Sequence, residues 1–210
     1  MPSTNPYEPS AYPPSQTALL FLDYQNFLVN MVPSPTNESL CNAAKTLLAA
    51  ARENNVAILH CLADTNLDPD PTSKVAATWD TQYKPLLSAN PQLSIEYAAF
   101  APTESSTDRE TIHMRKPGLR SVLEPEVVSY LREKLGVEHL ILAGIATSGA
   151  IMGTMSHGTD IGFVVSVVAE ACWDPSVQAH DELIKTVIPS LAWVSSVEES
   201  VGHLTGSARS

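Results

Sequence analysis

A chain of 210 residues, 44% of them hydrophobic, is long enough to build one α/β domain with a full core but too short for a second large domain. The net charge of −11, without any run of lysines or arginines, excludes the usual electrostatic basis for binding nucleic acid or an anionic membrane surface. We therefore expect a small-molecule substrate as the partner, with no nucleic acid and no membrane.

The three cysteines, Cys41, Cys61 and Cys172, share no short spacing, so they predict neither a disulfide framework nor a zinc knuckle. The first residues lack the basic and apolar regions of a secretory signal. No apolar run approaches the roughly 20 residues that span a bilayer. These observations together predict a cytoplasmic protein.

Five prolines lie within residues 1–16, among serine, threonine and asparagine. Such a segment buries too little apolar surface to offset the entropy lost on ordering. We expect a flexible N-terminal arm over residues 1–16, ahead of one α/β domain over residues 17–210. An arm of this kind can lie along a partner subunit.

The first strong element is the apolar run over residues 18–22, which predicts a buried strand ending at Asp23. A helical pattern opens near Thr36, and a second buried strand follows over residues 56–62. The stretch 63–102 contains five prolines and little periodicity, which is typical of a lid or a binding loop.

The second half of the chain continues the alternation of strands and helices. The predicted elements are a strand over 111–115, a helix from Pro125 that stops at Gly136, a strand over 139–143 with its own helix, a strand over 163–168, a helix over about 176–188 and a strand over 192–196. This alternation predicts a three-layer, Rossmann-like α/β fold, in which a mostly parallel sheet carries helices on both faces.

In folds of this kind, ligands bind outside the carboxyl ends of the strands. Asp23 follows the first predicted strand, and Lys116 follows the third. Although the two residues are far apart in sequence, the topology brings them to one edge of the sheet. There they form either a structural ion pair or part of a binding site.

The segment Gly144-Ile145-Ala146-Thr147-Ser148-Gly149-Ala150 connects the strand 139–143 to a helical pattern at the same edge. The first amides of a helix have no partner inside it, and the helix dipole adds positive potential. We therefore predict an anion or oxyanion site formed by the backbone of Ala146, Thr147, Gly149 and Ala150.

Three segments carry a family resemblance: Leu20-Phe21-Leu22-Asp23-Tyr24-Gln25-Asn26, Arg115-Lys116-Pro117, and the turn 144–150 with its helix. Together and in this order they resemble the isochorismatase-like hydrolases, also called the cysteine hydrolase superfamily. The resemblance implies a catalytic aspartate at Asp23, a catalytic lysine at Lys116 and a nucleophilic cysteine at the position of Ala150. It also implies a cis peptide bond between Ala146 and Thr147, and a homodimer or homotetramer.

Alanine at position 150 departs from the family pattern, because it has no lone pair with which to attack a carbonyl. One interpretation is a hydrolase or lyase that acts on a small carboxylated or carbonyl-bearing metabolite by acid–base chemistry of Asp23 and Lys116. A second is a cysteine amidohydrolase captured as a Cys-to-Ala variant at position 150. A third is a catalytically silent relative that binds a ligand. Retention of both charged residues favours an enzyme, since a buried pair is often less stable than apolar packing.

Several further residues are candidates for the substrate pocket: Tyr24, Gln25, Phe27, Asp64, Trp79, Arg120 and Trp173. Arg120 lies where family members commonly carry an aromatic segment, and it can supply an extra anion contact. Asp64-Thr65-Asn66 is similar to a metal-binding segment of the family's nicotinamidases, but asparagine replaces the histidine, so we expect no metal and no cofactor. His60 and Cys172 are predicted to be buried core residues.

Overall fold

Six strands form one sheet in the order β3-β2-β1-β4-β5-β6, and every neighbouring pair is parallel. These features come from a computed structural model, which describes residues 3–103 and 108–209. The strands are β1 Thr17–Leu22, β2 Ala57–Ala63, β3 Glu110–Arg115, β4 His139–Ile145, β5 Val164–Trp173 and β6 Trp193–Ser195. The predicted α/β fold is confirmed, and the sheet is parallel throughout.

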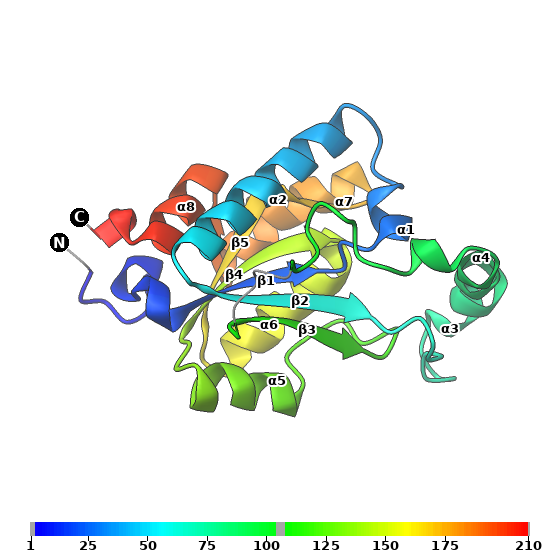
Figure 1. The fold of residues 1–210 in the computed structure, drawn as a ribbon, viewed down its shortest axis with the longest axis horizontal. Helices are drawn as coiled ribbons and strands as arrows, with labels where there is room; N and C mark the ends of the chain where they lie inside the picture. Colours follow the sequence, from blue (N-terminus) through cyan, green and yellow to red (C-terminus); the bar gives the residue numbers. More distant parts are fainter. Residues whose placement is uncertain (1–2, 104–107, 210) are drawn as a thin grey trace.

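The helices are α1 Asn26–Val29, α2 Thr36–Glu53, α3 Ala76–Thr78, α4 Lys84–Ala89, α5 Pro125–Ser129, α6 Met152–Asp160, α7 Val177–Glu182 and α8 Val197–Thr205. Helices α2 and α8 cover one face of the sheet, and α5 and α6 cover the other (Figure 1). Apolar side chains pack on both faces, which explains why β1 is buried at all six of its positions. The carboxyl ends of β2 and β3 point toward α3 and α4, while both chain termini lie at the opposite end (Figure 1).

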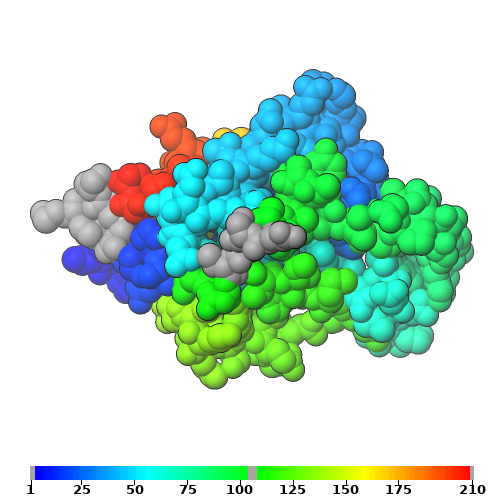
Figure 2. Space-filling view, viewed as in Figure 1, coloured from blue at the N-terminus to red at the C-terminus, as the bar shows by residue number. Residues whose placement is uncertain are grey.

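The stretch 63–102 is more regular than its prolines led us to expect. It contains α3, a π-helical turn at Trp79–Tyr83, α4 and a 3₁₀ turn at Pro91–Leu93. Pro85 is the second residue of α4, directly after the π-helical turn, so a continuous helical run passes through this proline. The segment forms a lobe that projects beyond the carboxyl edge of the sheet (Figure 2).

Strand β5 extends five residues beyond its predicted end at residue 168. Its pairing with β4 shifts register between Leu142 and Gly144, after which Cys172 and Trp173 pair with Gly144 and Ile145. This register shift is a β-bulge. The polar Glu170 lies in the bulged part of the strand, so the apolar run that predicts the strand stops before the strand does.

Residues 3–16 lie against the domain at the end of the sheet where the strands begin. The indole Nε1 of Trp193 donates to the carbonyl of Tyr7 at 3.0 Å, and Pro9 is buried. Met1 and Pro2, which belong to the predicted arm, lie outside the described residues. No helix in the described part of the chain is long and apolar enough to cross a membrane.

Candidate active site

A cleft lies at the carboxyl edge of the sheet, as predicted. It consists of two adjoining cavities of about 390 and 150 Å³ that share Asp23, Leu28, Val75, Arg115 and Gly118. The sheet supplies the floor, and the segment between β2 and α4 supplies one wall.

Asp23 directly follows β1 and is 6% exposed. Its backbone φ is 56°, in the left-handed region that residues with a Cβ rarely adopt, and its N–H donates to the carbonyl of Cys61 at 2.9 Å. Side chains held in this conformation cluster at functional sites, where the surrounding structure enforces them. The backbone thus directs one carboxylate into the cleft.

Arg115, and not Lys116, is the partner of that carboxylate. Its Nη1 and Nη2 donate to Oδ1 and Oδ2 of Asp23 at 2.6 and 2.5 Å, while its Nε donates to the carbonyl of Leu119 at 2.9 Å. Lys116 instead pairs with the exposed Asp70, with 2.7 Å between Nζ and Oδ1. Successive residues of a strand point to opposite sides, so only one of the two adjacent cations can face Asp23. The expected contact between Asp23 and Lys116 is therefore wrong.

The turn after β4 forms the third side of the site. Residues Thr147–Ile151 make a π-helical turn that leads into α6, and the cis peptide bond joins Ile145 and Ala146, one residue earlier than expected. The methyl group of Ala150, 4% exposed, lines the larger cavity together with Ala146 and Gly149.

Two amides of this turn already have acceptors in the protein. Gly149 N–H donates to the carbonyl of Ala146 at 3.0 Å, and Ser148 N–H donates to Oδ2 of Asp174 at 2.7 Å. Of the other members of the predicted oxyanion set, Ala146 and Ala150 line the cleft, whereas Thr147 is fully buried and is not among the lining residues. Asp174 is buried and also accepts from the N–H of Ser176, so it fixes the turn to the start of α7. Sequence analysis missed this role, although an aspartate two residues before a helix cap is a known signal of local backbone bonding.

Glycine at two positions lets the chain close around the site. A Cβ on Gly144, whose φ is 155°, would lie 2.1 Å from the carbonyl oxygen of Leu22, because β1 and β4 approach closely beside Asp23. A Cβ on Gly153 would lie 2.4 Å from the Cβ of Arg120. The second glycine allows the loop that carries Arg120 to rest on α6.

The cleft is positively charged within a protein whose net charge is −11. Arg115 balances the charge of Asp23, and Lys74 and Arg120 add two further cations to the lining. Arg120 also donates from Nη1 to the carbonyl of Ser148 at 3.1 Å, which ties it to the turn. Sequence analysis predicted Arg120 but missed Arg115 and Lys74. The field inside the cleft favours an anionic ligand.

The remaining predicted pocket residues divide into two groups. Phe27 and Trp79 line the smaller cavity, and the indole of Trp79 donates to Asp68. Tyr24 is fully buried, and its hydroxyl donates to the carbonyl of Ala171 at 2.5 Å. Gln25 is fully buried and is hydrogen-bonded to backbone groups of Ala63 and Ser94. Asp64 accepts a hydrogen bond from Asn66. Neither Asp64 nor Trp173 is among the lining residues of the cleft.

No thiol replaces the missing cysteine. Cys172 is 5% exposed, and burial raises its pKa to about 12; burial also raises the pKa of Cys61. Both are therefore inert thiols, as predicted for Cys172. His60 is a core residue, also as predicted, and its two ring nitrogens lie 2.7 Å from Glu96 and 3.0 Å from Glu110.

A family model described as "Isochorismatase domain" matches residues 17–199. A 69-residue stretch is 30% identical to YecD, an uncharacterized isochorismatase family protein of Escherichia coli O157:H7, and it spans 33% of this chain and 37% of that relative.

Solved structures of similar fold cover the whole domain. An isochorismatase family protein from Burkholderia thailandensis matches with a TM-score of 0.72 and 20% identity, over 97% of this chain and 98% of that one. A cysteine hydrolase from Pseudomonas syringae pv. phaseolicola gives 0.70 and 16% over 92% and 94%. The MAR1 ribonuclease from Caenorhabditis elegans gives 0.69 and 16% over 93% and 84%. Identities this low show the shared fold alone.

Proposed function

Because this chain belongs to the isochorismatase family, we propose that it is a hydrolase that acts on a small anionic metabolite without a cysteine nucleophile. The observation that carries the proposal is the arrangement in the cleft. A carboxylate held by Arg115 and a methyl group at position 150 line the same cavity, beside two additional cations. The substrate classes that fit are carboxylated compounds with a carbonyl carbon that water can attack, such as amides and esters.

The pairing of Asp23 supports a role as a general base. Both of its oxygens accept hydrogen bonds from Arg115, which hold the carboxylate in a fixed orientation in the cleft. In the proposed reaction, Asp23 takes a proton from a water molecule while the water oxygen bonds to the electrophilic carbon. The same proton then passes to the leaving group as its bond breaks. Arg115 replaces Lys116 in this scheme as the cation that holds the base.

The other groups of the cleft orient the substrate. In the proposed reaction, Arg120 and Lys74 attract its carboxylate, and the backbone amide of Ala150 stabilises a developing oxyanion. Phe27 supplies an apolar wall for the remainder of the molecule.

A catalytically silent relative is the second candidate. The observation in its favour is that both oxygens of Asp23 already accept hydrogen bonds within the protein, which leaves fewer acceptor positions for a water molecule. Such a protein binds carboxylated ligands through Arg120 and Lys74 but releases them unchanged.

Asp23→Asn, tested on a panel of carboxylated amides and esters, distinguishes the two. A hydrolase loses at least about 100-fold in kcat with its substrate, as expected when a general base is removed. Asp70→Asn, which breaks the exposed pair with Lys116, serves as the matched control and should retain full activity. Near-UV circular dichroism checks that both variants are folded. Unchanged kcat in Asp23→Asn refutes the proposal, and calorimetric binding without turnover by the wild-type protein supports the silent relative.

Ala150→Cys tests whether the cleft is that of a cysteine amidohydrolase that lacks only its nucleophile. The new thiol lies at the start of a helix and beside Arg115, both of which stabilise a thiolate. We expect it to react with iodoacetamide near pH 7 at least about 10-fold faster than free cysteine. A rate no higher than that of free cysteine would contradict the arrangement of the site, whereas new amidase activity in the variant would support the cysteine-hydrolase alternative.

A further inference from the structure

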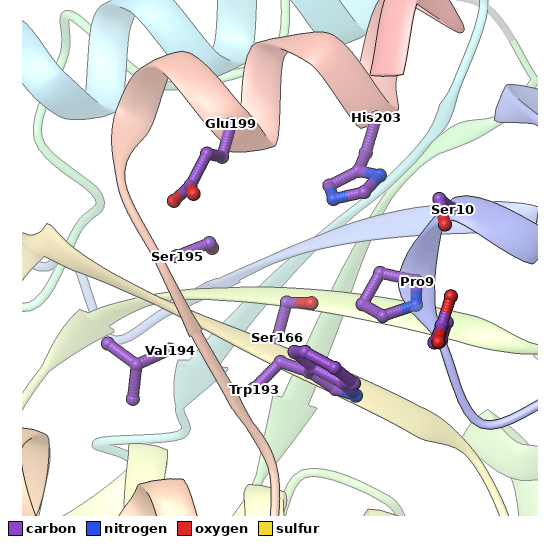
Figure 3. Close-up of a pocket in the computed structure, with 9 residues that line it drawn as sticks. Pro9, Ser10, Ser166, Trp193, Val194, Ser195, Glu199 and His203 are labelled. Atoms are coloured by element: carbon purple, nitrogen blue, oxygen red, sulfur yellow. The ribbon is translucent and has the colours of Figure 1, made fainter. Parts of the chain in front are cut away.

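A second cavity, of about 360 Å³, lies at the end of the sheet opposite the cleft. The N-terminal arm, β5, β6 and α8 form its walls (Figure 3). Ser166 near the start of β5 lines this cavity, whereas Trp173 ends the same strand beside the cleft turn. Seven residues of strand separate them by roughly 20 Å, so the two sites are distinct.

Ser166, which lines this cavity, belongs to a buried polar cluster in the sheet. Thr17, His139 and Ser166 are fully buried at the starts of three adjacent strands. The Nε2 of His139 lies 2.9 Å from Oγ of Ser166, and its Nδ1 lies 3.4 Å from Oγ1 of Thr17. Burial lowers the pKa of His139 to about 3, which keeps its ring neutral. Buried polar groups are unfavourable unless they are paired, and these three side chains are paired with one another. Apolar side chains could fill the same space, so packing alone does not require this polar cluster.

His203 reaches into the cavity from α8, above Ser166 (Figure 3). Its ring lies 5.5 Å from that of His139, and burial lowers its pKa, so it is neutral near pH 7. Within the described residues, its buried Nδ1 has no hydrogen-bond partner. A neutral imidazole adds no positive charge to the cavity, so it does not oppose a cationic ligand.

The rim is negative and aromatic. Glu199 and Glu8 line the cavity, and hydrogen bonds lower the pKa of each, from Ser196 to Glu199 and from Ser3 and Asn5 to Glu8. No lysine or arginine of the described chain belongs to the lining. The indole of Trp193, 44% exposed, provides a flat apolar wall. Carboxylates and an indole face both attract a cation.

From this arrangement we propose that the cavity binds a small organic ammonium ion with an apolar body. The ammonium group donates to the carboxylate of Glu199, Glu8 adds to the negative charge of the rim, and the apolar body packs against Trp193. The volume lies within the range of small-molecule sites, about 300–1,000 Å³. An anion of the same size would face two carboxylates without a compensating cation.

Three probes of similar shape separate charge from apolar contact: tyramine, the neutral 4-ethylphenol and the anion 4-hydroxyphenylacetate. Titration calorimetry at pH 7 should show saturable binding of tyramine with one site per chain. Binding of the neutral compound should be about 10-fold weaker, because one charge-assisted contact is worth about 1.5 kcal/mol. The anion should not bind.

Glu199→Gln removes the charge while glutamine can still complete the helix cap with Ser196. We expect the Kd for tyramine to rise about 10-fold in this variant. Glu198→Gln, on the same helical turn but outside the cavity lining, is the matched control and should leave the Kd unchanged. Equal binding of all three probes, no binding of tyramine, or an unchanged Kd in Glu199→Gln would overturn the proposal.

Discussion

Replacing Arg115 by methionine and, separately, Lys116 by methionine tests which of these adjacent cations supports the site. Each substitution removes one positive charge and introduces an uncharged side chain of similar length. The side chains of Arg115 and Asp23 are both 8% exposed, so Arg115→Met leaves a buried carboxylate without its cation. Removing one partner of such a pair destabilises a protein by about 3–5 kcal/mol. Lys116 and Asp70 are 37% and 61% exposed, and a pair of that kind contributes about 0–1 kcal/mol.

Urea denaturation at pH 7, followed by circular dichroism, measures both free energies of unfolding. We expect the midpoint to fall sharply in Arg115→Met and to change little in Lys116→Met, with the slope m unchanged in both. Adding Asp23→Asn to Arg115→Met should recover part of the loss, because the double variant no longer buries an unpaired charge. Equal losses in the two methionine variants, or no recovery in the double variant, would refute the assignment of Arg115 as the buried partner.

Two further predictions concern the scaffold. Gly144→Ala should destabilise the protein by at least about 4 kcal/mol, because the new Cβ would clash with the carbonyl of Leu22. Gly136→Ala has open space around its Cβ and a φ of 66°, so it should cost about 1 kcal/mol. Similar urea midpoints for the two variants would contradict this prediction. The second follows from the pKa of His139, about 3 in the folded protein and near 6.5 when unfolded. Between these values the unfolded chain binds the extra proton, so stability is full above pH 6.5 and falls as the pH drops toward 3, by about 2 kcal/mol at pH 5. His139→Gln should remove that part of the pH dependence, and an identical pH profile in wild type and variant would count against it.

The order and type of the main elements follow from the sequence because each strand is a short apolar run buried on both faces. Helix α8 was missed, although Ser196 and Glu199 form a capping box that is visible in the sequence. The prolines of residues 63–102 predict an irregular segment, yet Pro85 lies within a helical run and Pro91 begins a 3₁₀ turn. In both cases the local sequence signals of helix ends are present, and packing against the rest of the domain decides which structure forms.

The sequence predicts the location of the site better than it predicts the contacts within it. Asp23, Arg120 and Ala150 line the cleft where the carboxyl ends of the strands meet. The choice between Arg115 and Lys116 depends on the residue at which β3 ends, and a shift of one position exchanges the two sides of a strand. Lys74 lines the cleft because the lobe packs beside the carboxyl edge of the sheet, and no periodicity in the sequence indicates that packing.

The methyl group of Ala150 has a consequence for how the protein responds to oxidants. All three cysteines are buried and free, and burial raises the pKa of each thiol. Peroxide attacks accessible thiolates, and this cleft is lined by guanidinium groups, a carboxylate and backbone amides instead. Ligand binding in the cleft should therefore persist through oxidative stress that would convert an exposed catalytic thiolate to a sulfinic acid.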